Sequence, residues 1–528
     1  MALSKDITFQ NSGYFTKIMI DYLNANDKLK PFYNHYPTLE HFKLQIEQKK
    51  NFSQTHRTVL TTALAKQYSS FSISEETQNN IELLNQPTTF TITTGHQLNL
   101  FTGPLYFLYK IVSTINLTQE LKTQYPNYDF VPIYWMATED HDFEEINHFQ
   151  LNQKKISWNK EASGAVGELN LEGLDEVFNT FSDEIGISKD AAYLRSLFKK
   201  AYLEHNNLAD ATLFLANELF ADHGLVVVDA NKKSLKKLFT PYIKEELLQQ
   251  TSHKQVAKTI QGFDYPIQVN PREINLFYLD KNLRERIIKE DTSYRVNTTD
   301  LVFSETEILD LVDSNPEKFS PNVILRPLYQ EVILPNLCYI GGGGELAYWL
   351  ELKSFFEAVD IPFPMLLLRN SVLLLTQKQA RKMDKLGLSF SEIFQKQEIL
   401  VDQKTEAFSE TSVDFQELKN QLENQFKLLR AQVLKTDKSF EGAVNAQERK
   451  QIKGLENLEK RLRKANKKYF AERLDQIIAL QDQLFPNQSL QERQGNFSEF
   501  YAQYGKELID KLFEQLKPLD HNFDIIVL

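Results

Sequence analysis

Residues 88–148 read TTFTITTGHQLNLFTGPLYFLYKIVSTINLTQELKTQYPNYDFVPIYWMATEDHDFEEINH. A β-branched run ends at Gly95, and a helix of about twenty residues is expected to open at Thr102-Gly103-Pro104. A second apolar run, 131–137, leads into an acidic cluster. This order predicts a βαβ unit. Because open parallel sheets bind ligands at the carboxyl ends of their strands, we expect the polar residues after each strand to share a crevice.

The 528-residue chain is acidic and has a single cysteine. A net charge of −11 argues against proteins that bind nucleic acids or anionic membranes through a basic face. Cys338 alone allows no intramolecular disulfide and no zinc site with several cysteines, and we interpret it as a structural thiol. The N-terminus lacks an apolar signal-peptide core, and no apolar run reaches about eighteen residues. We therefore expect a cytoplasmic protein without a transmembrane helix.

Strand and helix patterns divide the chain into a Rossmann-like α/β core and a helical part. The predicted divisions are 1–150 for an N-terminal segment and the first half of the core, 151–320 for inserted connecting segments that return to the core near 224–250, 321–375 for the second half of the core, 376–486 for a helical coiled-coil domain, and 487–528 for a C-terminal segment packing on the core. In the helical part, apolar residues recur every three or four positions, which predicts an antiparallel hairpin of helices about thirty residues long.

Four local expectations concern residues 233–368. Residues 233–250 should form a helix that is kinked or restarted at Pro241. Residues 332–340 fit either a strand or a strand preceded by a helix, and 365–368 fit a buried strand. Residues 345–359 should form one helix.

The first strand-to-helix turn has two readings. Its polar residues are Thr94, Gly95, His96, Gln97, Thr102 and Gly103. Free N–H groups at a helix start favour a phosphate or carboxylate, so these residues are candidates for binding a substrate anion. The alternative is a capped helix after an ordinary turn.

The acidic cluster after the second strand is the more specific signal. It contains Glu139, Asp140, His141 and Asp142, with Asn147 close behind. Carboxylates at a strand end suit an ammonium group or general-base catalysis, and an adjacent histidine suits proton relay. The spacing by itself does not establish a metal site, and none is predicted. A solvated loop with helix-capping acids remains the alternative.

Two further junctions carry unusual residues. Gly341, Gly342 and Gly343, with Gly344, either let a backbone approach a ligand closely or form a plain turn. They match neither a Walker A loop nor a dinucleotide fingerprint. Arg369, at the end of the 365–368 run, fits an anion clamp or a surface ion pair.

The motifs TGHQLNLFTGPLYFLYK, VPIYWMATEDHDFEEINH, LRPLYQEVILPNLCYIGGGGELAYWLELK, PMLLLRNS and LFPNQSLQERQGN are long and widely spread. On them the chain resembles the bacillithiol biosynthesis cysteine-adding enzymes, a family of cysteine ligases. The resemblance implies a core like that of nucleotidyltransferases and class I synthetases, and a coiled coil that forms a homodimer. It also implies amide formation between cysteine and the amino group of glucosaminyl-malate, which is the last step in making a low-molecular-weight thiol.

The resemblance suggests roles for individual residues. His96, Asp140 and His141 would be catalytic, and Tyr348 would help the glycines to shape the sugar site. An adenine nucleotide, ATP or ADP, is implied as a possible cofactor, with Arg493 and Asn496 as its candidate ligands. The relatives' full His-x-Gly-His motif and Lys-Met-Ser-Lys-Ser loop are absent here. The energy source for amide formation therefore stays open.

Two rival hypotheses remain at this level. One is a nucleotidyltransferase-like enzyme that activates a different carboxylic acid. The other is a non-catalytic coiled-coil scaffold with a degenerate nucleotide-binding core, for which His96, Asp140 and Gly342 have no reason to lie together.

Overall fold

A five-stranded parallel sheet forms the centre of the larger part of the protein. The computed structural model describes residues 7–409 and 414–528. The sheet has the order β13-β12-β2-β3-β6, and its strands are β2 (Thr89–His96), β3 (Asp129–Met136), β6 (Val226–Asp229), β12 (Asn336–Gly341) and β13 (Met365–Leu368). Every pairing in it is parallel. The first strand along the chain is central, the next two lie on one side and the last two on the other.

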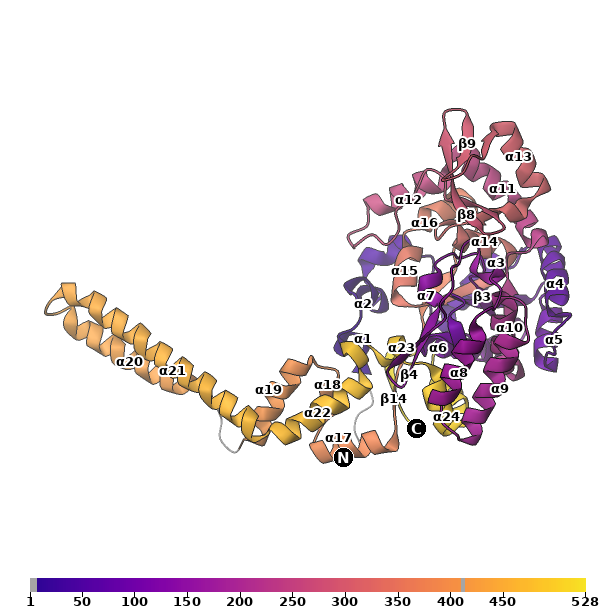
Figure 1. Ribbon diagram of the computed structural model, residues 1–528. Helices are drawn as coiled ribbons and strands as arrows, with labels where there is room; N and C mark the ends of the chain where they lie inside the picture. Colours follow the sequence, from indigo (N-terminus) through magenta and orange to yellow (C-terminus); the bar gives the residue numbers. More distant parts are fainter. Residues whose placement is uncertain (1–6, 410–413) are drawn as a thin grey trace. The chain divides into compact units, whose positions relative to one another are not determined.

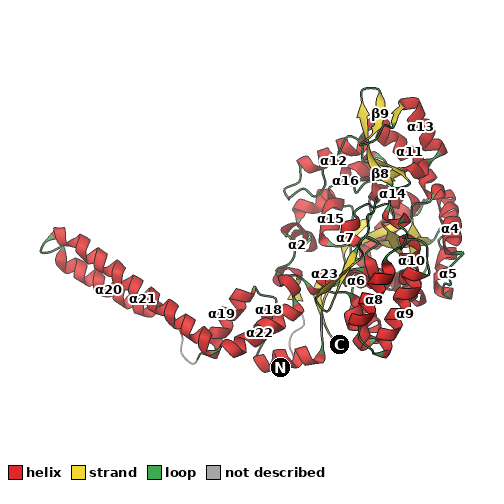
Figure 2. Ribbon diagram, viewed as in Figure 1, coloured by secondary structure: helices red, strands yellow, loops and turns green. Residues whose placement is uncertain are grey.

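This order is that of a doubly wound Rossmann-like sheet, as the sequence predicts. The order reverses between β2 and β12, where Thr94 donates to the Ile340 carbonyl oxygen at 2.8 Å. Residues 321–371 thus fold back beside residues 88–148 across the long insertion. All eight residues of β2 are buried, because helices cover the sheet (Figure 2). The crossover helix α6 (Tyr106–Gln124) contributes Leu117 and Leu121 to the core beneath it.

The turn between β2 and α6 differs from the expected helix start. Helix α6 begins at Tyr106, and the preceding residues Phe101, Thr102 and Gly103 all have positive φ, at 46°, 66° and 63°. The C-terminal segment holds this strained turn, because Asn496 donates to the carbonyl oxygens of Phe101 (2.9 Å) and Gly103 (2.6 Å). Thr102 is therefore not a helix cap. Because Asn496 lies about 390 residues after this turn in the sequence, the residues of the turn themselves do not reveal its conformation.

Residues 143–320 add two smaller layers around the core. A helix α7 (Phe143–Ile146) and a hairpin of β4 (His148–Leu151) and β5 (Lys154–Ser157) precede three helices, α8 (Leu174–Glu184), α9 (Lys189–Leu203) and α10 (Leu208–Phe220). After β6 come α11 (Lys233–Gln249), α12 (Thr251–Gln261) and a separate sheet of order β10-β9-β8-β7-β11. Its strands are β7 (Leu276–Asp280), β8 (Leu283–Glu290), β9 (Ser293–Val296), β10 (Val302–Ser304) and β11 (Phe319–Pro321), with α13 (Glu305–Ser314) between the last two.

Three local expectations can now be settled. Helix α11 continues through Pro241 as one helix, so the alternative of a fresh helix start there is wrong. Residues 332–340 are the end of α14 (Leu325–Ile333) followed by β12, which is the second of the two alternatives. The single helix expected over 345–359 is two helices, α15 (Gly343–Leu350) and α16 (Lys353–Ala358).

The two ends of the chain complete the larger unit. The N-terminal helices are α2 (Lys17–Leu23), α3 (Leu39–Lys49), α4 (Gln54–Tyr68) and α5 (Glu75–Leu83). The C-terminal segment contributes α23 (Gln491–Gln494), α24 (Phe497–Tyr504), α25 (Lys506–Gln515) and β15 (Asn522–Val527). Strand β15 lies in a small sheet of order β1-β15-β14, with β1 (Ile7–Thr8) and β14 (Ser371–Leu375).

Residues 375–488 cluster as a second unit, together with Asn11–Gly13. Its helices are α17 (Gln377–Leu386), α18 (Phe390–Ile393), α19 (Gln397–Phe408), α20 (Gln416–Val433), α21 (Glu441–Tyr469) and α22 (Ala471–Leu484). Helices α20 and α21 form the hairpin, side by side in Figure 1 and tied by the Lys419–Glu459 ion pair at 2.6 Å. Helix α21 has the expected length, but α20 has only 18 residues, shorter than the thirty expected. Residues 410–413 of that prediction lie outside the described residues.

Within the described residues, no helix is both long enough and apolar enough to cross a membrane.

Candidate functional site

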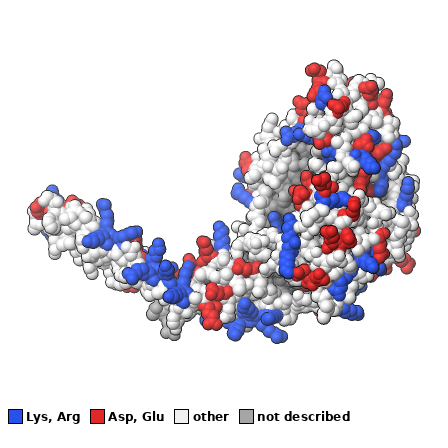
Figure 3. All heavy atoms as spheres, viewed as in Figure 1, with Lys and Arg blue, Asp and Glu red and all other residues white. Residues whose placement is uncertain are grey.

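A cavity of about 880 Å³ opens at the carboxyl ends of the parallel strands, around the point where the strand order reverses. In Figure 3 the face of the larger unit is hollowed, and acidic and basic side chains both stand beside the hollow. Twelve of the predicted site residues line the cavity: Gly95, His96, Gln97, Glu139, Asp140, His141, Asp142, Gly342, Gly343, Tyr348, Arg369 and Arg493. His96, Asp140 and Gly342 therefore share one site, which the scaffold hypothesis does not explain.

Six predicted residues do not line the cavity: Thr94, Thr102, Gly103, Asn147, Gly341 and Asn496. Thr94 bridges two strands, and Gly341 ends one of them. Thr102 and Gly103 belong to the strained turn. The Asn496 amide group donates its hydrogens to carbonyl oxygens of this turn, and its side-chain oxygen caps α24. These groups are occupied within the protein, so the geometry favours structural roles for them.

The cavity carries more positive than negative side chains, although the whole chain is acidic. Its cations are Lys110, Arg272, Arg284, Arg286, Arg326, Arg369 and Arg493, and its acids are Glu139, Asp140, Asp142 and Glu345. Clefts lined by one sign of charge attract ligands of the other sign. The cavity is therefore suited to an anionic substrate, and its acids can receive a cationic group of that substrate.

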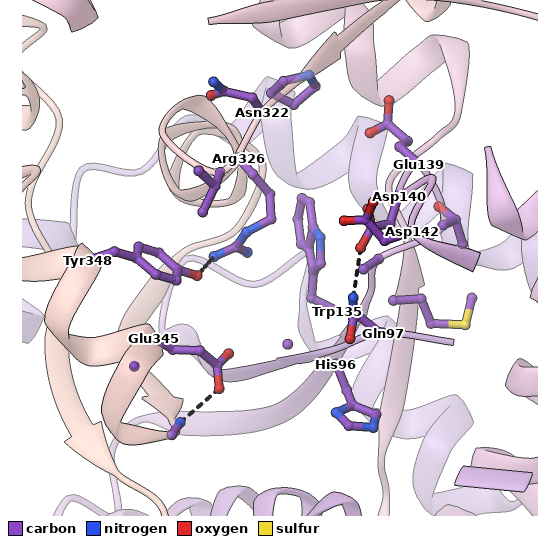
Figure 4. A pocket seen from close by; sticks show the side chains of 18 of the residues that line it. His96, Gln97, Trp135, Glu139, Asp140, Asp142, Asn322, Arg326, Glu345 and Tyr348 are labelled. Carbon is purple, nitrogen blue, oxygen red and sulfur yellow. Dashed lines mark hydrogen bonds between the residues drawn. The ribbon is translucent and has the colours of Figure 1, made fainter. Parts of the chain in front are cut away.

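Asp140 is held as a charged carboxylate. It accepts hydrogen bonds from Gln97 Nε2 at 3.0 Å and from the His141 backbone N–H at 2.8 Å (Figure 4). Burial by itself would raise its pKa, but the hydrogen bonds from His141 and Gln97 bring the pKa of Asp140 to about 2. Such a group is a poor general base near neutral pH and a good partner for an ammonium ion.

His141 contacts a cation from the inserted sheet. Its Nδ1 lies 2.7 Å from Arg284 Nη1, and because a guanidinium only donates, Nδ1 accepts. The Arg284 guanidinium also lies 4.1 Å from the centre of the Phe277 ring. Ligand atoms of Asp140, His141 and Asp142 come within 4.8 Å of one another, the spacing of a metal site. Arg284 already supplies a positive charge to this group.

Glu139 is held by a lysine that does not itself line the cavity. The buried Lys236 of α11 forms an ion pair with it and donates to the Phe319 carbonyl oxygen at 2.7 Å. Lys236 thus ties the end of β3 to the inserted sheet at β11.

The glycines hold the other wall of the cavity. Gly342 caps α15, and its N–H donates to Glu345 Oε2 at 2.8 Å. The same carboxylate pairs with Lys110 at 2.5 Å and accepts from the Tyr339 hydroxyl at 2.6 Å. A Cβ on Gly343 would stand 2.9 Å from Met19 Cγ, so this backbone must pack closely against α2.

His96 is a neutral imidazole under this arrangement. Burial, together with the neighbouring Lys110, lowers the pKa of His96 to about 3. Its Nε2 is buried and has no hydrogen-bond partner among the described residues. An orphaned ring nitrogen facing a cavity is rare in folded proteins and is expected where a ligand completes the site.

Arg369 is oriented by the C-terminal segment. Its Nη2 donates to Glu492 Oε1 at 2.7 Å, and Glu492 also accepts from Ser371 Oγ (3.2 Å) and Val372 N (3.1 Å). Both charged side chains are buried, so the reading of Arg369 as a surface ion pair is wrong. The guanidinium lies 4.9 Å from the centre of the Tyr106 ring, and its Nε has no partner among the described residues.

Several cavity residues were not predicted from the sequence. Arg272, Arg284 and Arg286 come from the inserted sheet and the segment before it, which carry no ligand motif. Lys110 lies one turn inside α6. It could have been predicted as a site residue, because the helix that follows the first strand of a parallel sheet begins at the ligand-binding edge. Arg326 is the second residue of α14, a helix that the sequence offered only as one of two alternatives.

The sequence matches two family models along nearly its whole length. Residues 3–370 match "Bacillithiol biosynthesis BshC, N-terminal Rossmann-like domain", and residues 372–528 match the "C-terminal coiled-coil domain" of the same family.

Similar proteins carry the same description. Proteins from Flavobacterium psychrophilum and Flavobacterium johnsoniae, each described as "Putative cysteine ligase BshC", are 60% and 59% identical, over 98% and 99% of both chains. A solved structure described as an arginyl-tRNA synthetase from Campylobacter jejuni is 12% identical and covers 88% of this chain and 95% of its own, with a TM-score of 0.22, which is too low to bear on fold or function. On the family models and these relatives, the chain belongs to the bacillithiol biosynthesis BshC family.

Proposed function

We propose that this protein is a cysteine ligase that joins the carboxyl group of cysteine, as an amide, to the amino group of glucosaminyl-malate. Family membership supports the reaction, and the relatives' description as cysteine ligases supports the amino acid. The observation that carries the proposal is the cavity itself, in which a carboxylate cluster and a set of cations meet at the switch point of the sheet. This distribution matches an amino sugar that carries one ammonium group and two malyl carboxylates.

The acidic wall would receive the amine. Asp140, which stays ionised, would orient the ammonium group, together with Glu139 and Asp142. The ammonium group must lose one proton to solvent before it can attack. As the amine attacks, His141 would take the second proton on Nδ1, which requires Arg284, now donating to Nδ1, to shift away. A C–N bond forms at the cysteine carboxyl carbon and one C–O bond of that carboxyl breaks, so that this oxygen leaves as water or, after activation, with the activating group.

The opposite wall would hold the anions. His96 and Gln97 would hold a carboxylate or phosphate, and the glycine turn with Tyr348 would shape the sugar site. An adenine nucleotide, when bound, would supply the leaving group that activates the carboxyl. Arg493 and Lys110 line the cavity and would attract the phosphates of the nucleotide. Asn496 is a weaker candidate, because its amide hydrogens already bond to carbonyl oxygens of the protein.

The coiled-coil hairpin would form a homodimer. Leu458 and Leu462 on α21 are 54% and 39% exposed, although they belong to its apolar stripe. A second copy would cover them. The variant Leu458→Glu should shift the purified protein from dimer to monomer in sedimentation velocity. The conservative Leu458→Met should not, and a wild-type protein that is monomeric at micromolar concentration would refute the dimer.

The reaction is tested with purified protein, glucosaminyl-malate and cysteine, with and without ATP and Mg²⁺. Mass spectrometry should detect the cysteinyl amide in at least one condition, and serine in place of cysteine should give far less product. The ATP arm decides the nucleotide requirement directly. Absence of the amide in every condition, from a folded protein, would refute the proposal.

A further inference from the structure

Among the buried or partly buried cations of the cavity, only Arg284 and Arg326 form no ion pair with a carboxylate of the described residues, and Arg284 instead donates to His141 in the acidic cluster. Lys110 pairs with Glu345, Arg369 with Glu492, and Lys236 behind the wall with Glu139. Arg326 lies near the start of α14 and forms no ion pair with any carboxylate among the described residues. A desolvated charge without a partner is costly, so a fold keeps one where a ligand supplies the missing charge.

The surroundings of Arg326 orient it without neutralising it. Its Cζ lies 5.4 Å from the centre of the Tyr339 ring, 5.8 Å from Trp349 and 6.0 Å from Trp135. Nη1 donates to Gln330 Oε1 at 3.1 Å, and Nη2 donates to the Tyr348 hydroxyl at 3.3 Å. Aromatic faces stabilise a cation but carry no net charge. These two bonds use two of the five N–H groups of a guanidinium, and the rest are left for a ligand in the cavity.

The fork of an arginine matches a carboxylate with two parallel hydrogen bonds. Under the proposed function, on which this inference rests, the candidates are the cysteine carboxyl and the malyl carboxylates. Catalysis gains nothing from holding the reacting carboxylate tightly in its ground state. A full positive charge is better used on a carboxylate that does not react.

The shape of the site agrees with that choice. In Figure 4, Arg326 and Tyr348 stand on one side of the Trp135 ring, and Asp140 and Gln97 stand on the other. An amino sugar with its ammonium group at Asp140 would therefore reach the Arg326 side with its far end. We propose that Arg326 binds a malyl carboxylate of the amino-sugar substrate and thereby selects the malyl conjugate over free glucosamine.

The test is a binding measurement, so that it does not depend on turnover. Isothermal titration calorimetry would compare glucosaminyl-malate with its malyl dimethyl ester, in the wild type, Arg326→Met and Arg326→Lys. We expect Arg326→Met to weaken glucosaminyl-malate binding about 10- to 100-fold, the size of a charge-assisted hydrogen-bond pair. The ester should bind wild type and Arg326→Met equally. Arg326→Lys, which keeps the charge but loses the fork, should fall between them.

Control experiments distinguish binding of the malyl carboxylate by Arg326 from a general effect of positive charge in the cavity, and from binding of another anion by Arg326. Arg493→Met removes a charge from the same cavity and should change the malyl preference less than twofold. Titrations with L-malate and with cysteine separate the two carboxylate sources, and only L-malate should depend on Arg326. Equal weakening of the ester, or a loss confined to cysteine or ATP, would overturn the assignment. A thermal melt of each variant shows whether it is folded, and Arg326→Lys carries the test if Arg326→Met is not.

The outcomes distinguish this inference from the proposed function. If binding depends on Arg326 as described but no amide forms with cysteine, the ligase proposal fails and the carboxylate site stands. If the amide forms and Arg326→Met leaves the preference for the malyl conjugate unchanged, the carboxylate site fails and the ligase stands.

Discussion

The two ends of the central sheet contain similar buried ion pairs in very different states. At the amino end, Lys49 pairs with Glu331 at 2.9 Å, and Glu331 also accepts from Asn336 Nδ2 (2.6 Å) and Gln330 Nε2 (3.0 Å). At the carboxyl end, Arg369 pairs with Glu492, yet Arg369 Nε and His96 Nε2 have no partner among the described residues. A completed polar network fixes the fold, whereas an incomplete one beside a cavity is a site prepared for a ligand.

The largest effect is expected from Asp140→Asn. Removing the charge that would hold the substrate ammonium should lower the rate of amide formation about 100- to 1,000-fold, with little change in the melting temperature. Because the pKa of Asp140 is about 2, the wild-type rate should not follow its titration between pH 5 and 8. Asp280→Asn, on the exposed β7–β8 hairpin, is the control and should keep the wild-type rate. More than a tenth of wild-type activity in Asp140→Asn would contradict the role.

A matched pair of variants tests the comparison between the two ends directly. Glu331→Gln and Glu492→Gln each remove the charge of a buried ion-paired carboxylate and should each lower the free energy of unfolding by about 3 kcal/mol. Only Glu492→Gln should also raise KM, about tenfold, because Arg369 then loses its orientation at the cavity. Chemical denaturation and steady-state kinetics on both proteins provide the measurements. A similar KM increase in Glu331→Gln would show that the two ends are not functionally distinct.

The dependence of stability on pH should be carried in part by Asp524 of β15. Burial raises its pKa to about 7, against the hydrogen bond from Asn370 at 3.0 Å. The folded state therefore binds a proton that the unfolded state releases near pH 4, so this stabilisation is present below pH 4 and is lost as the pH rises towards 7. Relative to Asp524→Asn, the wild type should lose about 2 kcal/mol between pH 4 and 8. Parallel unfolding curves for the two proteins at all pH values would rule this out.

The smallest effect concerns two helical glycines. A Cβ on Gly344 or on Gly454 would meet no atom within 4 Å, so alanine should stabilise each helix by up to about 1 kcal/mol. Gly344 lines the cavity and Gly454 lies in α21, outside it. Gly344→Ala should therefore weaken glucosaminyl-malate binding severalfold, while Gly454→Ala should leave it unchanged. Equal binding by both variants would place the sugar elsewhere in the cavity.

Parts of the fold and the site were accessible from the sequence because their signals are local. The strands of the core, the hairpin of α20 and α21, and the polar residues after β2, β3 and β12 follow from periodicity and from the position of strand ends. The long motifs of the two halves also identified the family correctly.

What only the tertiary structure decided lies where distant segments meet. Asn496 holds a turn that no local pattern marks, Glu492 orients Arg369 across the whole helical insertion, and Arg326 stands unpaired among three rings. The sequence by itself determined which strand ends are polar, because hydrophobic periodicity is a property of neighbouring residues. It did not determine which charges find a partner, because ion pairing depends on distances across the fold. Arg326, which has no carboxylate partner among the described residues, is the charge on which the proposed carboxylate site rests.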